Sequence, residues 1–195
     1  MKTTKEEILN AALTVFAQKG YEGALLRDIS ASLGITKPAL YKHFESKEAL
    51  WNAMIDSAQR YYSEHIGLIS DIPIPDDWEE FRELSLRQIN FTLHDKTVRR
   101  VRRLLMKEQF RDERIGTLAT RHFVTDIEER FTKVFAGMME KGLVKSSDPA
   151  LLAFEYTAPV TVMIHYCDRE PDKEPEIIKK IEAHIRQFTV DHKTT

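Results

Sequence analysis

Residues 35–44 read ITKPALYKHF, a stretch too short to form a stable helix alone and too polar on one side to be core. Thr36 is a natural N-cap, and Pro38 stands in the first turn, where its missing N–H is no loss. At about 100° per residue, the apolar and polar side chains separate onto two sides. The packing side holds Leu40, His43 and Phe44, and the outer side holds Lys37, Pro38, Tyr41 and Lys42. The pattern predicts a short helix that packs through one side and contacts another molecule through the other.

Two helices with marked ends precede this stretch. The first runs from about Thr4 to Lys19, because Thr4 and Glu7 form a capping box and Gly20 is placed for a left-handed cap. The second is short and ends at Gly34, which can adopt the positive φ of a sharp turn. Together they match the helix-turn-helix plan, whose second helix enters the major groove of DNA, about 12 Å wide. An ordinary helical hairpin at the end of a bundle is the alternative at this point.

A longer set of motifs surrounds the stretch, in residues 11–55, AALTVFAQKGYEGALLRDISASLGITKPALYKHFESKEALWNAMI. A helix closes in F-x-x-x-G-Y and is followed by R-D-I, by L-G-x and by the run L-Y-x-H-F-x-x-K-E-x-L. In these motifs the sequence resembles the N-terminal domain of the TetR/AcrR family of bacterial transcriptional regulators. The resemblance implies an all-α fold of nine or so helices and a homodimer that binds double-stranded DNA at an inverted repeat. It also implies release by a small-molecule effector, with repression as the usual mode.

The resemblance assigns DNA contacts to individual positions. Carried over, the family's base and phosphate contacts fall on Arg27, Thr36, Lys37, Pro38, Ala39, Tyr41, Lys42 and Lys47. Lysines suit guanine acceptors or phosphates, Pro38 and Ala39 suit a thymine methyl group, and the Tyr41 hydroxyl suits a phosphate. Lys47 stands in the first turn of the next helix, where exposed backbone N–H groups add to its positive charge.

One segment departs from the family pattern. Where the family has threonine or serine before R-D-I, at the start of the second helix, this chain has Gly23, Ala24 and Leu25. A capping hydroxyl and a phosphate contact are therefore expected to be missing. DNA affinity should be lower unless backbone N–H groups take their place.

The remainder of the chain also has helical periodicity, so the fold class is all-α, and we expect one long helix through residues 123–138 that closes at Gly142. We expect a DNA-binding domain in residues 1–47 and a ligand-binding and dimerisation domain in residues 48–195. The helix at 149–167 is apolar nearly all round, and the helix at 176–190 has an isoleucine stripe. These helices have more apolar surface than one small domain easily covers, so we expect the homodimer to form through them. A well-buried core helix is the alternative for 149–167.

Polar residues on apolar helix faces are candidates for the effector site. With the aromatic residues near them, they are Gln88, Phe91, Glu108, Phe110, Phe154, Glu155, Tyr156 and His165. A buried carboxylate needs a partner, and an arginine or a backbone donor is the expected one for each. The sharper hypothesis is that Glu108 or Glu155 receives a lipophilic cation in an aromatic cavity.

Composition excludes several classes of function. The net charge is −2, so any DNA binding must come from a local patch. The single cysteine, Cys167, cannot form an internal disulfide, and the histidines lack metal-ligand spacing. No nucleophile motif or phosphate-binding loop is present, so we expect neither an enzyme nor a cofactor. No apolar run approaches a membrane span, which favours a cytoplasmic protein. A DNA-bound adaptor whose C-terminal domain binds a protein partner is the alternative function.

Overall fold

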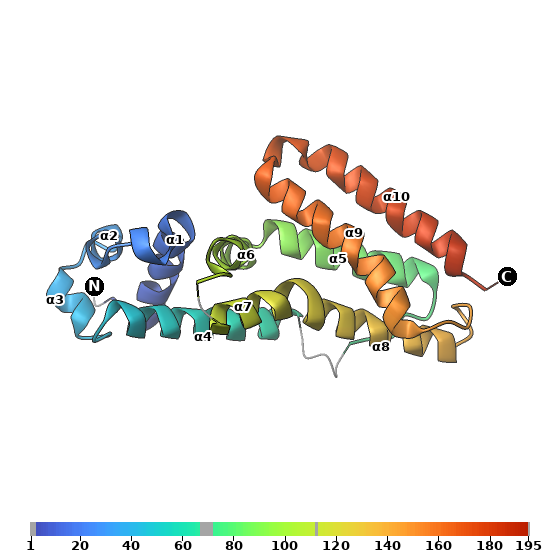
Figure 1. Cartoon of the computed structure of the whole chain (residues 1–195), viewed down its shortest axis with the longest axis horizontal. Coiled ribbons are helices and arrows are strands. Elements are labelled where there is room, and N and C mark those ends of the chain that lie inside the picture. Colours follow the sequence, from blue (N-terminus) through green and yellow to red (C-terminus); the bar gives the residue numbers. More distant parts are fainter. Residues whose placement is uncertain (1–2, 67–71, 112, 195) are drawn as a thin grey trace. The chain divides into compact units, whose positions relative to one another are not determined.

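The computed structural model describes residues 3–66, 72–111 and 113–194, and Figure 1 shows their helical arrangement. Within these residues the only β pairing is an isolated bridge between Val144 and Lys193. The expected all-α fold is confirmed. The chain groups into two compact units, one made of residues 1–66 and 95–119 and the other of residues 67–94 and 120–195.

The first unit contains the predicted helix-turn-helix. Its helices are α1 (Lys5–Gly23), α2 (Leu26–Ser32), α3 (Lys37–Tyr41), α4 (Lys47–Ile66), α6 (Lys96–Glu108) and α7 (Glu113–Thr120). The capping box of Thr4 and Glu7 is formed at the start of α1. Gly20 has φ 72° and bends the chain, so the regular part of α1 ends where the sequence predicted. Fully buried Ile8, Ala12, Phe16 and Leu50 form much of this unit's core.

The second unit is built around aromatic side chains. Its helices are α5 (Trp78–His94), α8 (Asp126–Glu140), α9 (Pro149–Arg169) and α10 (Glu174–His192), with a π-helical turn at Arg121–Thr125 and a 3₁₀ turn at Pro171–Lys173. Helices α9 and α10 lie side by side (Figure 1). Phe81 and Phe135 are fully buried with the Ile177 and Ile181 stripe of α10. The one-sided stripe predicted for this last helix therefore packs into the unit's own core.

The helix predicted through residues 123–138 is interrupted. The structure forms a π-helical turn at Arg121–Thr125 between α7 and α8, so α8 begins only at Asp126. The predicted end at Gly142 is confirmed by its φ of 71°. Periodicity alone could not locate the break, because a single π turn moves the side chains by only part of a helical turn.

The two units do not follow the predicted domain limits in the chain. Helix α4 and residues 95–119 group with the N-terminal helices, whereas the expected boundary was at residue 47. That boundary divides functions, which the grouping of residues does not test, so it stays a prediction. Among the described residues, no helix is long and apolar enough to cross a membrane.

Candidate DNA-binding surface and effector site

Helix α3 is held at its start by its cap and in its middle by its apolar side. The Thr36 hydroxyl accepts a hydrogen bond from the backbone N–H of Ala39 at 3.4 Å. Leu40 is only 1% exposed, and Phe44 beyond the helix end is also buried. The predicted outer residues Lys37, Pro38, Tyr41 and Lys42 are all exposed. A five-residue helix is thus fixed by packing and leaves its polar side open to a partner.

His43 departs from the predicted pattern, because it is exposed. Helix α3 ends at Tyr41, and the chain then turns, with the N–H of His43 donating to the carbonyl of Leu40 at 3.0 Å. This bond spans three residues instead of the four of an α-helix, so the 100° step does not hold at His43. The packing role expected for His43 is therefore wrong, whereas Phe44 is buried as predicted.

The turn between α2 and α3 has the expected glycine geometry. Gly34 has φ 64°, a conformation that side chains rarely adopt. The N–H of Ile35 donates to the carbonyl of Ser30 at 3.0 Å and closes the end of α2. At the start of α2, Leu25 occupies the N-cap and makes no side-chain cap bond. The absence of a capping hydroxyl, expected from the Gly23–Leu25 segment, is confirmed.

The cations on this surface differ in how firmly they are held. Lys37 lies over the Tyr41 ring, with its Nζ 5.7 Å from the ring centroid. The side chain of Arg27 is 78% exposed, and its Nε lies 3.9 Å from Asp28. Asp28 is itself engaged by Lys19 at 2.7 Å, and this hydrogen bond lowers the pKa of the Asp28 carboxyl. Arg27 is therefore able to reach a phosphate, because its acidic neighbour is already paired.

Lys47 is the most constrained of the predicted contacts. It begins α4, where the Ser46 hydroxyl caps the N–H of Ala49 at 2.9 Å. Its Nζ donates to the carbonyl of Glu22 at 3.4 Å and lies 4.4 Å from the centroid of the Tyr21 ring. The predicted cation at a helix start is present, and its side chain is held in one place.

Two of the predicted effector residues lie in the first unit, apart from the others. Glu108 accepts a hydrogen bond from the backbone N–H of Tyr21 at 3.1 Å, so its partner is the backbone donor that we expected. Phe110 follows α6 and is 93% exposed. The other predicted effector residues belong to the second unit. The sequence placed Glu108 on the apolar face of α6 but could not show that this face packs against α1.

Of the predicted effector residues in the second unit, Tyr156 is the one that lies within a cluster of aromatic rings. Tyr156 is 2% exposed, and its ring lies 4.7 Å from Phe131, 5.1 Å from Phe81 and 5.2 Å from Phe188, between centroids. Burial raises the pKa of its phenol, and the Ser85 hydroxyl opposes this more weakly. Within the described residues, neither hydroxyl meets the geometry of a hydrogen bond, and the Nε2 of Gln88 also lacks one. Buried polar groups of this kind are candidates for contact with a bound molecule.

The other predicted residues of the second unit differ in their exposure and in their partners. Glu155 is half exposed and lies 3.3 Å from Nε2 of His192, while Phe154 is 56% exposed. His165 makes an edge contact with Phe123 at 4.9 Å, and Phe91 is half-buried. Sequence reasoning missed Ser85, which lies one helical turn before Gln88 on the same apolar stripe of α5. That spacing was the available signal.

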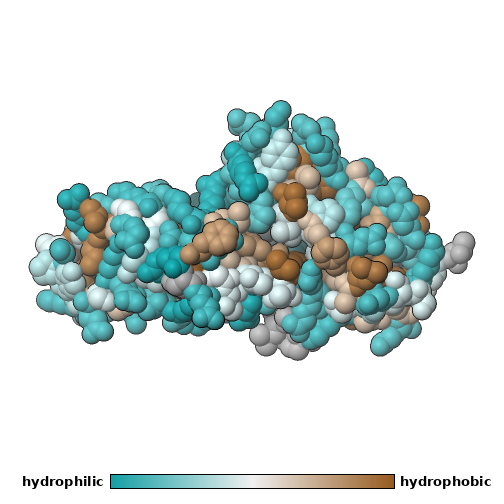
Figure 2. Space-filling model, viewed as in Figure 1, coloured by the Kyte–Doolittle hydropathy of each residue, from teal (hydrophilic) through white to brown (hydrophobic). Residues whose placement is uncertain are grey.

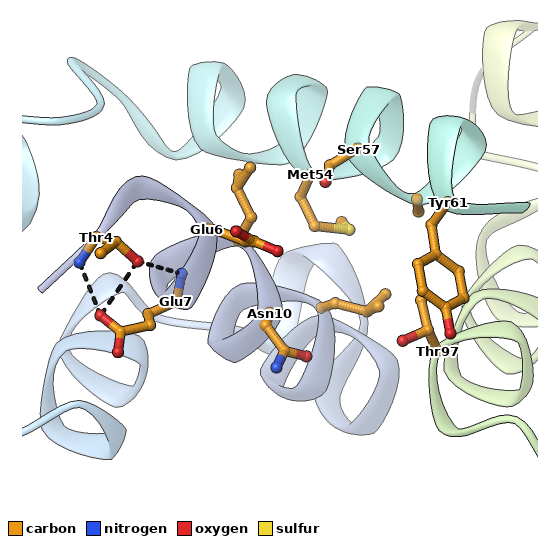
Figure 3. A pocket seen from close by; sticks show the side chains of 11 residues that line it. Thr4, Glu6, Glu7, Asn10, Met54, Ser57, Tyr61 and Thr97 are labelled. Carbon is orange, nitrogen blue, oxygen red and sulfur yellow. Dashed lines mark hydrogen bonds between the residues drawn. The ribbon is translucent and has the colours of Figure 1, made fainter. Parts of the chain in front are cut away.

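Two surface hollows lie outside these predicted sites. The hollow in Figure 3, about 380 Å³, lies between α1 and α4, with Thr4 and Glu7 at one end and Tyr61 at the other. Its polar groups are largely bonded already: Glu7 to Thr4, Asn10 to Arg100 and Tyr61 to Asp95. The other, about 620 Å³, lies along α5 and α10 and is lined by none of the predicted effector residues. Neither hollow points to a specific ligand.

Helix α9 has an exposed apolar face. Leu151, Phe154 and Val162 are 58%, 56% and 59% exposed, and they fall within one arc of the helix. The opposite arc, with Leu152, Tyr156 and Val160, is buried in the unit. Figure 2 shows hydrophobic surface in the region of the second unit where Figure 1 draws α9. The helix therefore packs through one side only, although its sequence is apolar nearly all round.

Comparison with known proteins supports the resemblance seen in the sequence. Residues 8–54 match the model of a family described as bacterial regulatory proteins, tetR family. A relative from Staphylococcus epidermidis, the biofilm operon icaADBC HTH-type negative transcriptional regulator IcaR, is 38% identical over 58 residues. IcaR of Staphylococcus aureus strain Newman is 41% identical over 51 residues. The matched segments cover 30% and 26% of this chain but only 31% and 27% of these relatives.

Solved structures resemble the chain over nearly its whole length. SmeT, the repressor of the Stenotrophomonas maltophilia multidrug efflux pump SmeDEF, covers 99% of this chain and 92% of its own, with TM-score 0.70 and 19% identity. A SmeT–triclosan complex gives TM-score 0.74 at 18% identity, covering 97% and 91%. A TetR-family regulator from Agrobacterium tumefaciens gives TM-score 0.70 at 18% identity and covers 97% of each chain. At these identities the likeness establishes the fold, which is the one that the resemblance implied.

Proposed function

We propose that this chain, whose residues 8–54 match the tetR family of bacterial regulatory proteins, is a homodimeric transcriptional repressor that binds an inverted-repeat operator and is released by a small hydrophobic ligand. The observation that carries the proposal is the division of α3 into a buried side and an exposed side. Leu40 is buried, whereas Lys37, Tyr41 and Lys42 are exposed. A helix fixed in this way can enter the major groove without rearranging.

The exposed residues have complementary roles toward DNA. Lys37 and Lys42 supply donors for guanine acceptors or phosphates, and Pro38 and Ala39 offer apolar contact to a thymine methyl group. Arg27, Thr36, Tyr41 and Lys47 supply phosphate donors around this helix. Most of these contacts go to the backbone of DNA, so binding should weaken steeply as salt is raised.

The exposed face of α9 supports a dimer. Leu151, Phe154 and Val162 cluster on one arc, and self-association through a two-fold axis would remove them from water. Helix α10 lies beside α9 and has an exposed Val190, so it can contribute to the same interface. A dimer would bring two reading helices to half-sites about 34–36 Å apart, so we expect it to bind an inverted repeat.

We place the proposed effector site in the second unit. Among the described residues, its buried Tyr156 and Ser85 hydroxyls and the Nε2 of Gln88 lack hydrogen bonds, and Tyr156 lies among aromatic rings. An apolar ligand with a hydrogen-bonding group would satisfy them. SmeT, which shares the fold, is a repressor with a known triclosan complex. Such a ligand would shift the protein off DNA by its differential affinity for the two conformations, about 1.4 kcal/mol per tenfold.

Selection of DNA by the full-length protein tests the central proposal. Purified protein is incubated with a library of random duplexes at low salt, and the recovered sequences are footprinted and titrated. We expect an inverted repeat, protected symmetrically, with affinity that falls steeply between low and physiological salt. Recovery of no common sequence, or of a single half-site bound by a monomer, would contradict the proposal.

A thermal-shift screen tests the effector class. Neutral and cationic hydrophobic compounds of matched size are compared on the wild type, on Tyr156→Phe and on Glu155→Gln. Since the unbonded groups of the second unit are neutral and Glu155 is half exposed, we expect neutral compounds to raise Tm more. The gain should shrink in Tyr156→Phe and persist in Glu155→Gln. A cation preference that disappears in Glu155→Gln would restore the charged-ligand hypothesis.

A further inference from the structure

The ring of Tyr21 is the meeting point of two cations in the first unit. The guanidinium carbon of Arg111 lies 3.7 Å from the ring centroid, and the Nζ of Lys47 lies 4.4 Å from it. Trp51 contacts the ring edge to face at 5.1 Å, and Phe16 lies parallel to it at 6.0 Å. Aromatic faces carry partial negative charge, so one ring can hold two cations that would otherwise repel each other.

Side chains of the last turn of α6 form hydrogen bonds with the backbone at and just before Tyr21. The Glu108 Oε1 accepts from the N–H of Tyr21 at 3.1 Å, and Lys107 Nζ donates to the carbonyl of Gln18 at 2.7 Å. Gly20 has φ 72°, and a Cβ there would lie 2.6 Å from Glu108 Oε1. Glycine at position 20 thus allows both the positive φ at the bend of α1 and the close contact with Glu108. The G-Y pair read in the sequence is the point where α6 holds α1.

Lys47 is fixed beside the same residue. Its ammonium donates to the carbonyl of Glu22, the residue after Tyr21, and still has donors left for a phosphate. A lysine side chain loses considerable rotamer entropy when it is immobilised. Contacts that immobilise it before DNA arrives reduce that loss on binding. The half-buried Tyr21 therefore does more than pack against its neighbours, because it restricts a predicted phosphate contact.

We propose that Tyr21 is a positioning residue that holds Lys47 ready for a DNA phosphate, and that Glu108 and Arg111, at the end of α6, hold Tyr21 in place. The proposal rests on the DNA-binding function proposed above. It assigns Glu108 a role in operator affinity instead of in ligand binding. It also makes α6 the element that sets the strength of one phosphate contact. In the chain, α6 stands between the two segments that form the second unit.

Salt dependence separates positioning from simple packing. Full-length wild type, Lys47→Gln, Tyr21→Leu and Glu108→Ala are titrated at several salt concentrations with the duplex recovered by selection. Each variant should bind about tenfold more weakly, and the slope of log affinity against log salt should fall by about 0.9 for each phosphate that the variant no longer neutralises. Glu108→Gln keeps an oxygen acceptor and should stay within about twofold of wild type. Lys96→Gln, at the opposite end of α6, removes an exposed lysine as a control and should keep the wild-type slope.

A double-mutant cycle completes the DNA test. In the Lys47→Gln background, Tyr21→Leu and Glu108→Ala should have little further effect, because the ammonium that they position is already absent. Additive decreases in affinity, or weaker binding with an unchanged salt slope, would show that Tyr21 only packs and would overturn the proposal. Melting curves confirm that each variant is folded at the assay temperature.

A measurement without DNA keeps the two proposals distinguishable. In the free protein, the Tyr21 ring should shift the side-chain NMR signals of Lys47 upfield, because the ammonium lies over the ring face. This shift should disappear in Tyr21→Leu, diminish in Glu108→Ala and persist in Glu108→Gln. If no duplex is selected but these shifts are observed, the DNA-binding function fails while the positioning stands. If Lys47 shows no ring-dependent shift, the positioning is refuted whether or not DNA is bound.

Discussion

Lys37 and Lys42 are both exposed on α3, but their surroundings differ. Lys37 lies over the ring of Tyr41, whereas Lys42 follows the last helical residue. Residues near the start of a reading helix usually contact base edges, and residues beyond it more often meet the phosphate backbone. The two lysines can therefore be separated by the kind of binding that each substitution weakens.

Substituting each lysine by alanine should give two different outcomes. If Lys37 reads a base, Lys37→Ala should reduce discrimination between the selected duplex and a single-base variant by about 1–3 kcal/mol. If Lys42 contacts a phosphate, Lys42→Ala should weaken binding to both duplexes equally and reduce the salt slope by about 0.9 per phosphate. Fluorescence anisotropy with matched duplexes at several salt concentrations checks both. The assignments are reversed if the two variants exchange these signatures.

Tyr156 offers a test of burial through pH. Burial raises the pKa of its phenol above the ordinary value of 10.0. Below about pH 10 the phenol is neutral in both the folded and the unfolded state, so its stabilising effect is fully present. Above that pH the unfolded state loses the proton first, and the free energy of unfolding falls by about 1.4 kcal/mol per pH unit. Tyr156→Phe removes this loss, so its Tm should fall less than that of wild type between pH 9 and about pH 11. At pH 7 it should be neutral or slightly stabilising, since the hydroxyl makes no hydrogen bond within the described residues.

Circular dichroism melts of the two proteins, in the same buffers, make this comparison. Other tyrosines titrate equally in both, so their contributions cancel. Parallel alkaline declines would show that the Tyr156 phenol reaches water in the folded protein.

Helix caps and turns were the features most readily predicted from sequence. Thr4 with Glu7, Thr36 before Pro38, and the positive φ of Gly34 all depend on neighbours within a few residues, so local rules suffice. Features that depend on distant partners were not predictable. Glu108 contacts Tyr21, 87 residues away in the chain, and periodicity cannot show which helix covers a given face.

The same limit applies to the candidate sites. The division of α3 into packing and exposed sides follows from its own spacing, so its outward residues could be named from sequence. Their assignment to DNA came from the family resemblance and stays a prediction. The effector candidates required knowing which helices meet in which unit, and the sequence mixed residues of both. Ser85 was missed because its one sequence signal, the spacing to Gln88, does not show that Tyr156 of α9 lies beside it.

The docking of α3 can be tested by removing its anchor. Leu40→Ala deletes most of a side chain that is 1% exposed, which should destabilise the first unit by about 2–5 kcal/mol. Tyr41→Ala alters the adjacent exposed residue and should change stability by less than about 0.5 kcal/mol while weakening DNA binding. Thermal melts and anisotropy titrations of both variants give the comparison. Equal stability of the two variants would mean that α3 does not depend on Leu40 for its position.

The proposed operator binding also requires assembly of two subunits. One subunit presents one reading helix, and joining two subunits makes the second half-site contact intramolecular. Helix α9 can serve this purpose because its two sides have separate tasks: Tyr156 and Leu152 face the unit's core, while Leu151 and Phe154 are exposed. A substitution on the exposed side should therefore separate subunits without unfolding either.

Leu151→Glu combined with Phe154→Glu is expected to produce a folded monomer. The two carboxylates would have to be buried without partners in a dimer, which is costly, but they remain in water in a monomer. For the double variant, sedimentation should show the mass of one 22.7 kDa chain, whereas we expect a dimer for wild type, and circular dichroism should be unchanged. Affinity for the inverted repeat should fall by about 10²–10⁴ while binding to an isolated half-site persists. Asn90→Glu with Lys133→Glu, on exposed positions of α5 and α8, adds negative charge outside this face and should remain dimeric. Wild type that sediments as a monomer at micromolar concentration, or a double variant that stays dimeric, would show that α9 is not the interface.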